Sequence, residues 1–232
     1  MKLAIMQPYF LPYIGYFQLI ASVDQFIVYD NIKYTKKGWI NRNRMLQNGS
    51  DVMFSLPLKK DSDSFEVVQR ELVPDFNRGK LLNQFSGAYR KAPYFEQTMP
   101  LIELIVRFED NNLFAYLHHS INQTCKYLGI TTEVRVSSTI DIDHILQSQE
   151  KVLALCQATN TKTYVNAIGG MELYSKEIFQ DKGIELKFIK SKPFEYKQFD
   201  KPFVPWLSIL DVLMFNPPDA VKNCVNQNYE LI

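Results

Sequence analysis

Residues 1–16 read MKLAIMQPYFLPYIGY, and this stretch decides the fold. Lys2 to Met6 is an apolar run typical of a buried strand, a turn rich in proline and aromatic residues follows, and Gly15 opens a helical pattern. In α/β proteins this order places a ligand beyond the carboxyl end of the strand, near the amino end of the helix. We therefore expect a binding site bordered by Gln7, Tyr9, Phe10, Pro12, Tyr13, Gly15 and Tyr16. The alternative is a structural turn wedged into the core.

The composition is typical of a globular protein of 232 residues, with 46% hydrophobic and 22% charged residues. The net charge of +1 provides no field that would attract nucleic acid or a membrane surface. No apolar run reaches the length of about 18 residues that spans a bilayer, and prolines interrupt the apolar amino-terminal stretch. We therefore expect a cytoplasmic protein with no signal peptide and no membrane insertion. The cysteines have no paired spacing and are expected to be buried, reduced thiols: Cys125, Cys156 and Cys224.

Strands and helices alternate at both ends of the chain, which predicts a parallel α/β sheet. The expected strands are 2–6, 25–29, 133–137, 164–168 and 184–189, and the expected helices at the two ends are 15–22, 148–159, 174–182 and 205–215. The sequence thus predicts a Rossmann-like, three-layer α/β domain over residues 1–232 with a mainly parallel sheet.

Two insertions are expected within this domain. Residues 39–47 and 53–58 flank the turn Asn48-Gly49 and predict a hairpin. Residues 76–128 predict a helical subdomain that covers one side of the sheet. Residues 65–72 alternate loosely and are a candidate strand, and the residues after 215 are expected to pack as a tail.

The segment 33–44 is rich in both cations and aromatic or amide side chains. Such a mixture can hold phosphates while stacking on a base or a sugar ring. The residues that we expect to bind a phosphorylated small molecule are Lys36, Trp39, Asn41 and Arg42. If the segment is a regular strand, alternation places Trp39 and Asn41 on one face and Arg42 on the other, and we then expect Asn41 to face the ligand with Trp39. The alternative is an exposed hairpin whose charges are only solvated.

A second strand-to-helix turn follows the strand 164–168. Its paired glycines could let an anion approach the backbone, and polar side chains beside them could contact the ligand. The candidate residues are Asn166, Gly169, Gly170 and Tyr174. We expect this turn to share a pocket with the first one, because the carboxyl ends of parallel strands meet at one edge of the sheet. The alternative is a plain turn in which glycine supplies a positive φ.

The sequence gives little support for a metal centre or a nucleophilic triad. Asp141 and Asp143 precede His144, but aspartates at such positions more often cap a helix. Neither paired histidines with metal-ligand spacing nor a Gly-x-Ser-x-Gly motif occurs. We therefore assign no metal and no catalytic residue.

Tyr13-Ile14-Gly15-Tyr16 resembles the H-x-G-H tetrad of the nucleotidyltransferase superfamily in position and in its glycine. In that superfamily the histidines donate hydrogen bonds to phosphate oxygens. Tyrosine is a neutral donor of high pKa that does not become cationic near neutral pH. The tetrad could bind a phosphate or a ribose, but it lacks the usual means of neutralising a leaving pyrophosphate.

Four blocks of the sequence resemble the WbqC-like protein family: MQPYFLPYIGYFQLI (6–20), VDQFIVYDNIKYTKKGWINRNRML (23–46), YVNAIGGMELYSKEIFQDKGIELKFI (164–189) and PFVPWLSILDVLMFN (202–216). Members of this family are typically encoded among genes for O-antigen and other surface polysaccharides. The resemblance implies a transferase that modifies a nucleotide-linked amino sugar in O-antigen or lipopolysaccharide biosynthesis. Transfer of an aminoacyl group such as glycyl is the reaction it suggests, and it implies no catalytic residues.

Two alternatives to this function stay open. One is a nucleotidyltransferase-like ligase that adenylates a carboxylate, and the other is a non-catalytic binding or scaffold protein of the pathway. The expected ligand is a small nucleotide sugar, and no nucleic acid is expected. A nucleotide or an acyl donor is the candidate cofactor or cosubstrate, and a homodimer is a candidate assembly.

Overall fold

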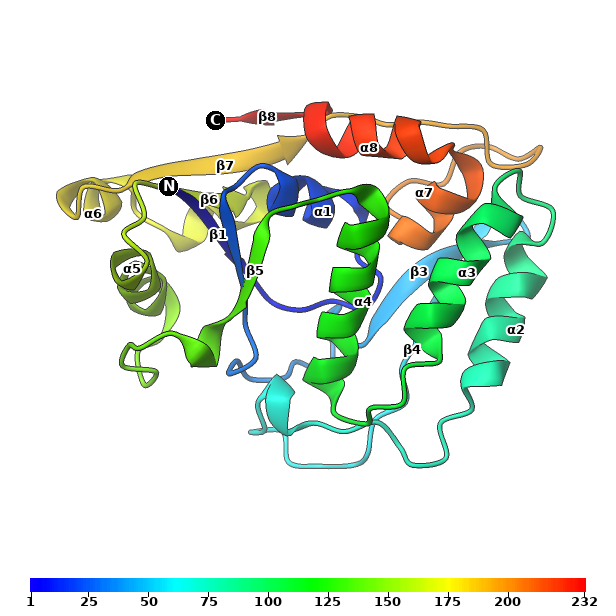
Figure 1. The fold of residues 1–232 in the computed structure, drawn as a ribbon, viewed down its shortest axis with the longest axis horizontal. Coiled ribbons are helices and arrows are strands. Elements are labelled where there is room, and N and C mark those ends of the chain that lie inside the picture. Colours follow the sequence, from blue (N-terminus) through cyan, green and yellow to red (C-terminus); the bar gives the residue numbers. More distant parts are fainter.

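The computed structural model describes residues 1–232 and contains a six-stranded sheet in the order β5-β2-β1-β6-β7-β8 (Figure 1). All neighbouring strands are parallel except β7 and β8, which are antiparallel. The strands are β1 (Lys2–Met6), β2 (Gln25–Val28), β5 (Glu133–Val136), β6 (Thr163–Ala167), β7 (Glu185–Ser191) and β8 (Tyr229–Leu231). The predicted α/β class with a mainly parallel sheet is confirmed.

The first strand, β1, lies in the middle of the sheet, and its carboxyl end borders the place where a ligand can bind. Leu3, Ala4 and Ile5 are buried because helices cover both faces of the sheet. β1 pairs with β2 on one side and with β6 on the other, and the chain leaves β1 and β6 toward opposite faces. This is a topological switch point, where open α/β sheets form a crevice beyond the strand carboxyl ends.

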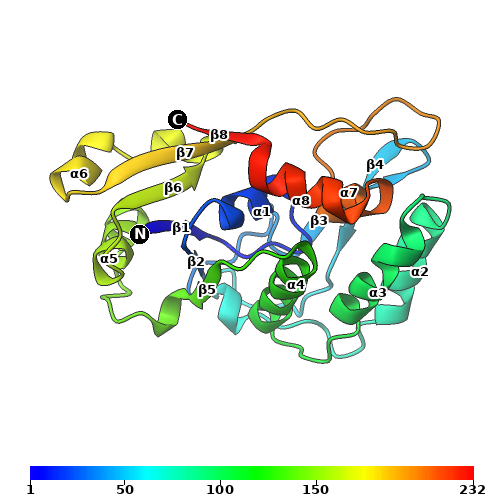
Figure 2. The same cartoon turned by 45° about the horizontal axis from the view of Figure 1, so that its top comes forward.

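Helices on the two faces of the sheet complete three layers (Figure 2). α1 (Ile14–Ala21) and α8 (Pro218–Gln227) pack on one face within an apolar core of 48 residues. α5 (Ser148–Ala158) and α6 (Lys176–Asp181) pack on the other face around a smaller core of 14 residues. The three-layer arrangement predicted from the sequence is confirmed.

The three cysteines lie in these cores and are free, as expected. Cys125 and Cys224 belong to the larger core and Cys156 to the smaller one. Burial raises the pKa of the Cys125 and Cys156 thiols to about 12, so both are protonated thiols at neutral pH.

The predicted hairpin is present as β3 (Arg42–Gln47) and β4 (Ser50–Ser55). Its two-residue turn contains Asn48 and Gly49, both with positive φ, which matches the right-handed twist of the strands. This turn pairs Gln47 with Ser50 and sets the register, so β4 begins three residues earlier than the sequence predicts. β3 begins only at Arg42, because the preceding segment from Trp39 forms a turn.

The helical segment consists of α2 (Arg78–Tyr89), α3 (Phe95–Val106) and α4 (Leu113–Leu128). In Figures 1 and 2, α2, α3 and the hairpin form the half of the molecule away from α5 and α6. The side chains of Asn77 and Asn112 cap α2 and α4, and Gly129 ends α4 with a φ of 70°. The larger core includes residues of all three helices, of the hairpin and of α1, and we therefore propose that residues 1–232 fold as one domain.

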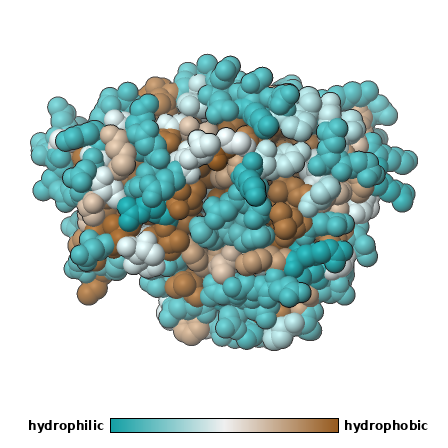
Figure 3. All heavy atoms as spheres, in the orientation of Figure 1, coloured by the Kyte–Doolittle hydropathy of each residue, from teal (hydrophilic) through white to brown (hydrophobic).

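None of these helices has both the length and the apolar character that crossing a membrane requires. On the face shown in Figure 3, hydrophilic side chains cover most of the surface, and hydrophobic ones are visible in separate patches. Scattered apolar exposure of this kind is ordinary for folded proteins.

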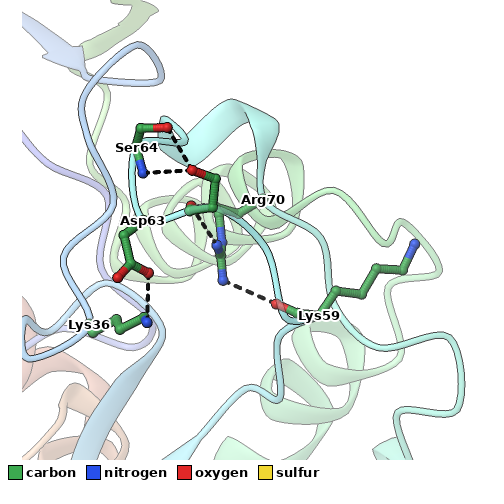
Figure 4. A network of polar contacts seen from close by, with 6 residues as sticks. Lys36, Lys59, Asp63, Ser64 and Arg70 are labelled. Atoms are coloured by element: carbon green, nitrogen blue, oxygen red, sulfur yellow. Dashed lines mark hydrogen bonds and ion pairs between the residues drawn. The ribbon is translucent and has the colours of Figure 1, made fainter.

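Three sequence predictions about secondary structure need correction. Residues 65–72 are no strand: only a 3-10 turn, η1 (Val67–Gln69), forms there, closed by a capping box between Glu66 and Gln69. The loop around it is held by Arg70, whose guanidinium donates to the carbonyls of Ser62 and Lys59 (Figure 4).

The helix expected from residue 205 begins only at Ile209, as α7 (Ile209–Phe215), because the Ser208 side chain caps it. The expected carboxyl-terminal tail is instead the helix α8, with Pro218 at its first position, and the strand β8.

A buried aspartate, Asp30, joins the carboxyl ends of β2 and β5. Its carboxylate accepts hydrogen bonds from the hydroxyls of Ser137 and Ser138, and from the backbone N–H of Ser138. Burial opposes ionisation of Asp30, but these donors outweigh burial and lower its pKa below the ordinary value of 3.8. An acid whose pKa is lowered by folding stabilises the fold above its unfolded pKa, and this stabilisation is lost as the pH falls through the lowered pKa.

We expect Asp30→Asn to lower the free energy of unfolding by about 1–3 kcal/mol at pH 7, because the amide group meets donors where the carboxylate accepted them. The difference from the wild type should stay constant down to about pH 4 and shrink below it. Urea unfolding of both proteins across this pH range measures the effect. Asp61→Asn is the control, since Asp61 is exposed, and it should change the free energy by less than about 0.5 kcal/mol. A difference that grows at low pH would contradict the prediction.

Candidate functional site

A cavity of about 660 Å³ opens at the carboxyl ends of β1, β6 and β7, at the switch point of the sheet. Its volume falls within the range of about 300–1,000 Å³ that is typical of small-molecule sites. Its walls come from the first turn and α1, the hairpin, the ends of β6 and β7, and the loop before α7. The lining residues are Met6, Tyr9, Pro12, Tyr13, Gly15, Tyr16, Leu19, Trp39, Asn43, Arg44, Ala167, Ile168, Ile189, Lys190, Ser191 and Trp206.

The turn after β1 is held in place by hydrogen bonds to its backbone. The hydroxyl of Tyr16 donates to the carbonyl of Gln7 at 2.9 Å. The side chain of the buried Asn43 donates to the carbonyls of Phe10 and Leu11 at 3.3 and 2.9 Å. Leu11 has a φ of 43°, a conformation that costs energy for a residue other than glycine and that these contacts maintain. The hairpin therefore fixes the shape of the turn that forms one wall of the cavity.

Aromatic rings form much of the cavity surface. Tyr13 packs against Trp206 with 5.2 Å between ring centroids, and Tyr9 packs against Tyr16 at 5.7 Å. Trp39 and Trp206 are 42% and 61% exposed, so part of each side chain is accessible to a ligand. Burial raises the pKa of Tyr9, Tyr13 and Tyr16, which are therefore neutral phenols at physiological pH.

Two cationic side chains contribute to the lining. One guanidinium nitrogen of Arg44, Nη1, pairs with Asp51 at 3.0 Å, and the other, Nη2, donates to the carbonyl of Trp206 at 3.4 Å. The guanidinium carbon of Arg44 also lies 5.4 Å from the centroid of the Trp39 ring. Lys190 pairs with Glu230 at 3.5 Å, with both side chains largely exposed. The cavity thus combines aromatic planes with positive charge, an arrangement suited to a planar ring that carries an anionic group.

Comparison with known protein families matches residues 7–223 to the WbqC-like protein family. The chain belongs to the WbqC-like protein family. It is similar to a protein of Mycobacterium tuberculosis (strain ATCC 25618 / H37Rv) named uncharacterized protein Rv1507c, with 29% identity over 230 residues, covering 96% of this chain and 98% of the relative. No solved structure matches significantly.

In this WbqC-like protein, six of the candidate residues predicted from the sequence line the cavity. They are Tyr9, Pro12, Tyr13, Gly15, Tyr16 and Trp39. The second turn also reaches the same cavity, as expected, but through Ala167 and Ile168 instead of the paired glycines. The turn after β1 and the cation-rich segment 33–44 therefore meet at this cavity. The turn after β6 also reaches it, but with residues other than those selected from the sequence.

Some candidates in the turn after β1 and in the turn after β6 do not line the cavity and have structural contacts elsewhere. Phe10 is fully buried in the core, and the carbonyl of Gln7 accepts the Tyr16 hydroxyl. The side chain of Asn166 accepts from the N–H of Ala167 and occupies the space beside Gly170. Two further candidates also lie away from the lining, Gly169 and Tyr174, and Tyr174 packs on the smaller core.

Three candidates of the hairpin segment also have other partners. Lys36 is exposed and pairs with Asp63 at 2.6 Å (Figure 4). Asn41 does not face the cavity with Trp39, because its side chain accepts from the Tyr34 hydroxyl and donates to the carbonyl of Leu56.

Arg42 donates to the carbonyl of Gly38 and is not among the lining residues. Trp39 lies in the turn before β3, so strand alternation does not separate it from Arg42. The guanidinium carbon of Arg42 lies 6.0 Å from the Trp39 centroid, whereas the guanidinium that lines the cavity is that of Arg44.

Ten lining residues were missed from the sequence: Met6, Leu19, Asn43, Arg44, Ala167, Ile168, Ile189, Lys190, Ser191 and Trp206. Asn43 and Arg44 lie in the cation-rich segment 33–44, but the arginine selected there from the sequence is Arg42, which is not among the lining residues. Trp206 was hidden in the predicted helix 205–215, and its φ of 61° shows that the chain turns sharply there. Nothing in the sequence around Ser191 signals a site.

Proposed function

We propose that this WbqC-like protein is a transferase that binds a nucleotide-linked amino sugar in the cavity and modifies it during biosynthesis of bacterial surface polysaccharide. The observation that supports this most is the combination, in one cavity at the switch point, of exposed aromatic faces and the guanidinium of Arg44. Transfer of an aminoacyl group such as glycyl is the finer form of the proposal.

The aromatic faces suit the flat parts of such a ligand. A base stacks on Trp or Tyr with a contribution of about 1–3 kcal/mol, and the apolar face of a sugar ring packs on the same surfaces. Tyr13 packs against Trp206 and the Arg44 guanidinium lies near Trp39, yet 61% and 42% of these two tryptophans remain exposed, which favours a role in binding.

The cations suit the diphosphate. Arg44 presents a planar guanidinium whose present partners, Asp51 and a carbonyl, lie at a partly exposed position, so a phosphate can compete for its donors. Lys190 adds a second charge. Two cations within a bounded cavity fit one small anionic ligand, whereas a polynucleotide would need a longer basic track.

The two alternative functions have no separate structural observation in their favour. Tyr16 donates to the carbonyl of Gln7, so its hydroxyl hydrogen is already committed where the H-x-G-H tetrad would present a donor to phosphate. Tyr13 stays neutral, so it adds no positive charge for a leaving pyrophosphate.

Native mass spectrometry and calorimetry with UDP-glucose, UDP-N-acetylglucosamine, GDP-mannose, dTDP-glucose, ATP and glucose test the proposal. We expect at least one nucleotide sugar to bind more tightly than ATP and than free glucose. Binding of ATP with amino-acid-dependent pyrophosphate exchange would instead indicate the ligase, and absence of binding to every nucleotide sugar would overturn the proposal.

Trp206→Ala should weaken binding of the nucleotide sugar by about 1–3 kcal/mol, because the variant loses one stacking surface. The expected effect on folding is small, since the ring is 61% exposed. Isothermal titration calorimetry measures the affinity and thermal unfolding checks the fold. Leu173→Ala is the control: Leu173 is 68% exposed and lies outside the cavity, so its removal should leave affinity unchanged. Equal affinities of Trp206→Ala and the wild type would remove Trp206 from the site.

A further inference from the structure

Ser191, the last residue of β7, lines the cavity and contacts a buried amide on α1. Its Oγ lies 2.5 Å from Oε1 of Gln18. An amide oxygen can only accept a hydrogen bond, so the hydrogen in this contact must come from the serine. The direction of the contact therefore depends on which amide atom of Gln18 faces Ser191.

The orientation of the Gln18 amide is determined by two carbonyl groups near the end of α8. Gln18 is 1% exposed, and its Nε2 donates to the carbonyls of Cys224 and Asn228 at 3.0 and 3.1 Å. Turning the amide over would place Oε1 against two carbonyl oxygens, which offer no hydrogen. Each carbonyl would lose the bond from Gln18 and keep only its backbone donor, the N–H of Asn228 for Cys224 and the N–H of Lys192 for Asn228. Oε1 must therefore face Ser191.

Ser191 consequently has no hydrogen left for a ligand. A serine hydroxyl carries one hydrogen and two lone pairs, and its hydrogen is committed to Gln18. Only lone pairs are available to the cavity. We propose that Ser191 is a specificity-determining residue that accepts a hydrogen bond from a hydroxyl or amino group of the ligand's sugar and disfavours a phosphate, carboxylate or carbonyl oxygen at that place. This inference rests on the proposed function.

The space around the Ser191 hydroxyl also favours contact with one group of the ligand. Gly15 lies directly opposite, and a Cβ there would be 2.8 Å from Ser191 Oγ and 3.2 Å from two ring atoms of Tyr13. The absence of a side chain at position 15 leaves the hydroxyl room to meet the ligand. Since the lone pairs repel an anion, we expect the phosphates at Arg44 and not at the start of α1 beside Ser191.

Neutron diffraction from crystals of the wild-type chain, exchanged into deuterium oxide, tests the polarity without any ligand. We expect the deuteron of Ser191 on the line from Oγ to Gln18 Oε1, and two deuterons on Gln18 Nε2 directed to the carbonyls of Cys224 and Asn228. A deuteron on Ser191 that points into the cavity would overturn the proposal, whether or not the protein binds nucleotide sugars.

Binding of UDP-glucose and its 2-, 3-, 4- and 6-deoxyfluoro derivatives tests the consequence, because fluorine cannot donate a hydrogen bond. We expect one derivative to bind the wild type about tenfold more weakly than UDP-glucose. Ser191→Ala should reduce that difference to less than about twofold. In Gln18→Leu the Ser191 hydroxyl has lost its acceptor and can rotate. The difference in affinity between UDP-glucose and that derivative should therefore shrink in this variant too. Ser22→Ala is the control, since Ser22 donates to the carbonyl of Leu19 and lies outside the cavity.

The outcomes separate this inference from the proposed function. If the wild type binds no nucleotide sugar, the proposed function fails and the neutron result alone decides the polarity of Ser191. If UDP-glucose binds but no derivative is discriminated, or the discrimination persists in Ser191→Ala, the specificity role is wrong while the proposed function stands.

Discussion

Replacing Asp211 with alanine is expected to lower the free energy of unfolding by about 3–5 kcal/mol, the largest stability effect that we predict. Asp211 is fully buried in α7 and accepts hydrogen bonds from the hydroxyls of Tyr89 and Tyr196 at 2.9 and 2.7 Å. It also accepts from Nε2 of Gln198 at 2.7 Å. Removing the carboxylate takes the acceptor away from three donor groups, of which Gln198 Nε2 keeps only its bond to the carbonyl of Val204. The side chains of Tyr89 and Gln198 are buried, so water cannot replace the lost acceptor.

The loss of unfolding free energy in Asp211→Ala is limited, because the wild type bears the cost of burying the Asp211 carboxylate and the variant does not. Burial raises the pKa of Asp211, while its three donors lower it and offset part of the desolvation. The hydroxyl of Tyr89 also accepts the N–H of Leu46, so this network joins the hairpin, α2 and α7. Loss of Asp211 should therefore loosen the contact of the hairpin with α7 near the cavity.

Urea unfolding measures the predicted loss. Asp200→Ala is the matched control, because Asp200 and its partner Lys197 are almost fully exposed, with side chains 97% and 82% accessible. The control should differ from the wild type by less than about 0.5 kcal/mol. If Asp211→Ala were as stable as Asp200→Ala, the buried network would not contribute to the fold as argued.

Arg44→Ala is expected to weaken binding of the nucleotide sugar by about 1.5–3 kcal/mol, the loss of a charge-assisted hydrogen bond to phosphate. Arg44 lines the cavity, and its present ion pair with Asp51 is partly exposed, so folding should lose less than about 1 kcal/mol. Calorimetric titration, with thermal unfolding as a check on the fold, measures both quantities.

Arg42→Ala is the matched control for this prediction. Both arginines lie on β3 and approach the ring of Trp39, at 6.0 Å for Arg42 and 5.4 Å for Arg44. Only Arg44 lines the cavity, so Arg42→Ala should change affinity less than about threefold. The opposite ranking would move the phosphate site to Arg42, the residue first selected from the sequence.

Most of the fold could be predicted because its signals are local. The strand β1 has the predicted bounds, and Asn48-Gly49 marks the hairpin turn. α4 ends at Gly129, as the pattern of apolar residues and the glycine indicate. The errors occurred where a local signal was ambiguous: the loose alternation in 65–72 forms no strand, and a capping serine delays α7 to Ile209.

The candidate site was predicted less completely. Tyr13, Gly15 and Trp39, which were selected as binding residues, line the cavity, and each stands out within its own segment. Ser191 and Trp206 were missed, because a serine at the end of a strand and a tryptophan in an apolar run have no distinctive pattern. Asn41 is not among the lining residues, because its amide bonds to the Tyr34 hydroxyl and to the carbonyl of Leu56.

The sequence by itself determined the class of the fold, the position of the first strand and the turn that follows it, since apolar periodicity, turn residues and helix caps act over a few neighbouring positions. Only the tertiary structure decided which side chains share the cavity. Its walls come from residues 6–19, 39–44, 167–168, 189–191 and 206. These segments meet because β1 lies between β2 and β6 and because the hairpin packs on the first turn, and contacts between such distant segments depend on strand order and packing that no local pattern encodes.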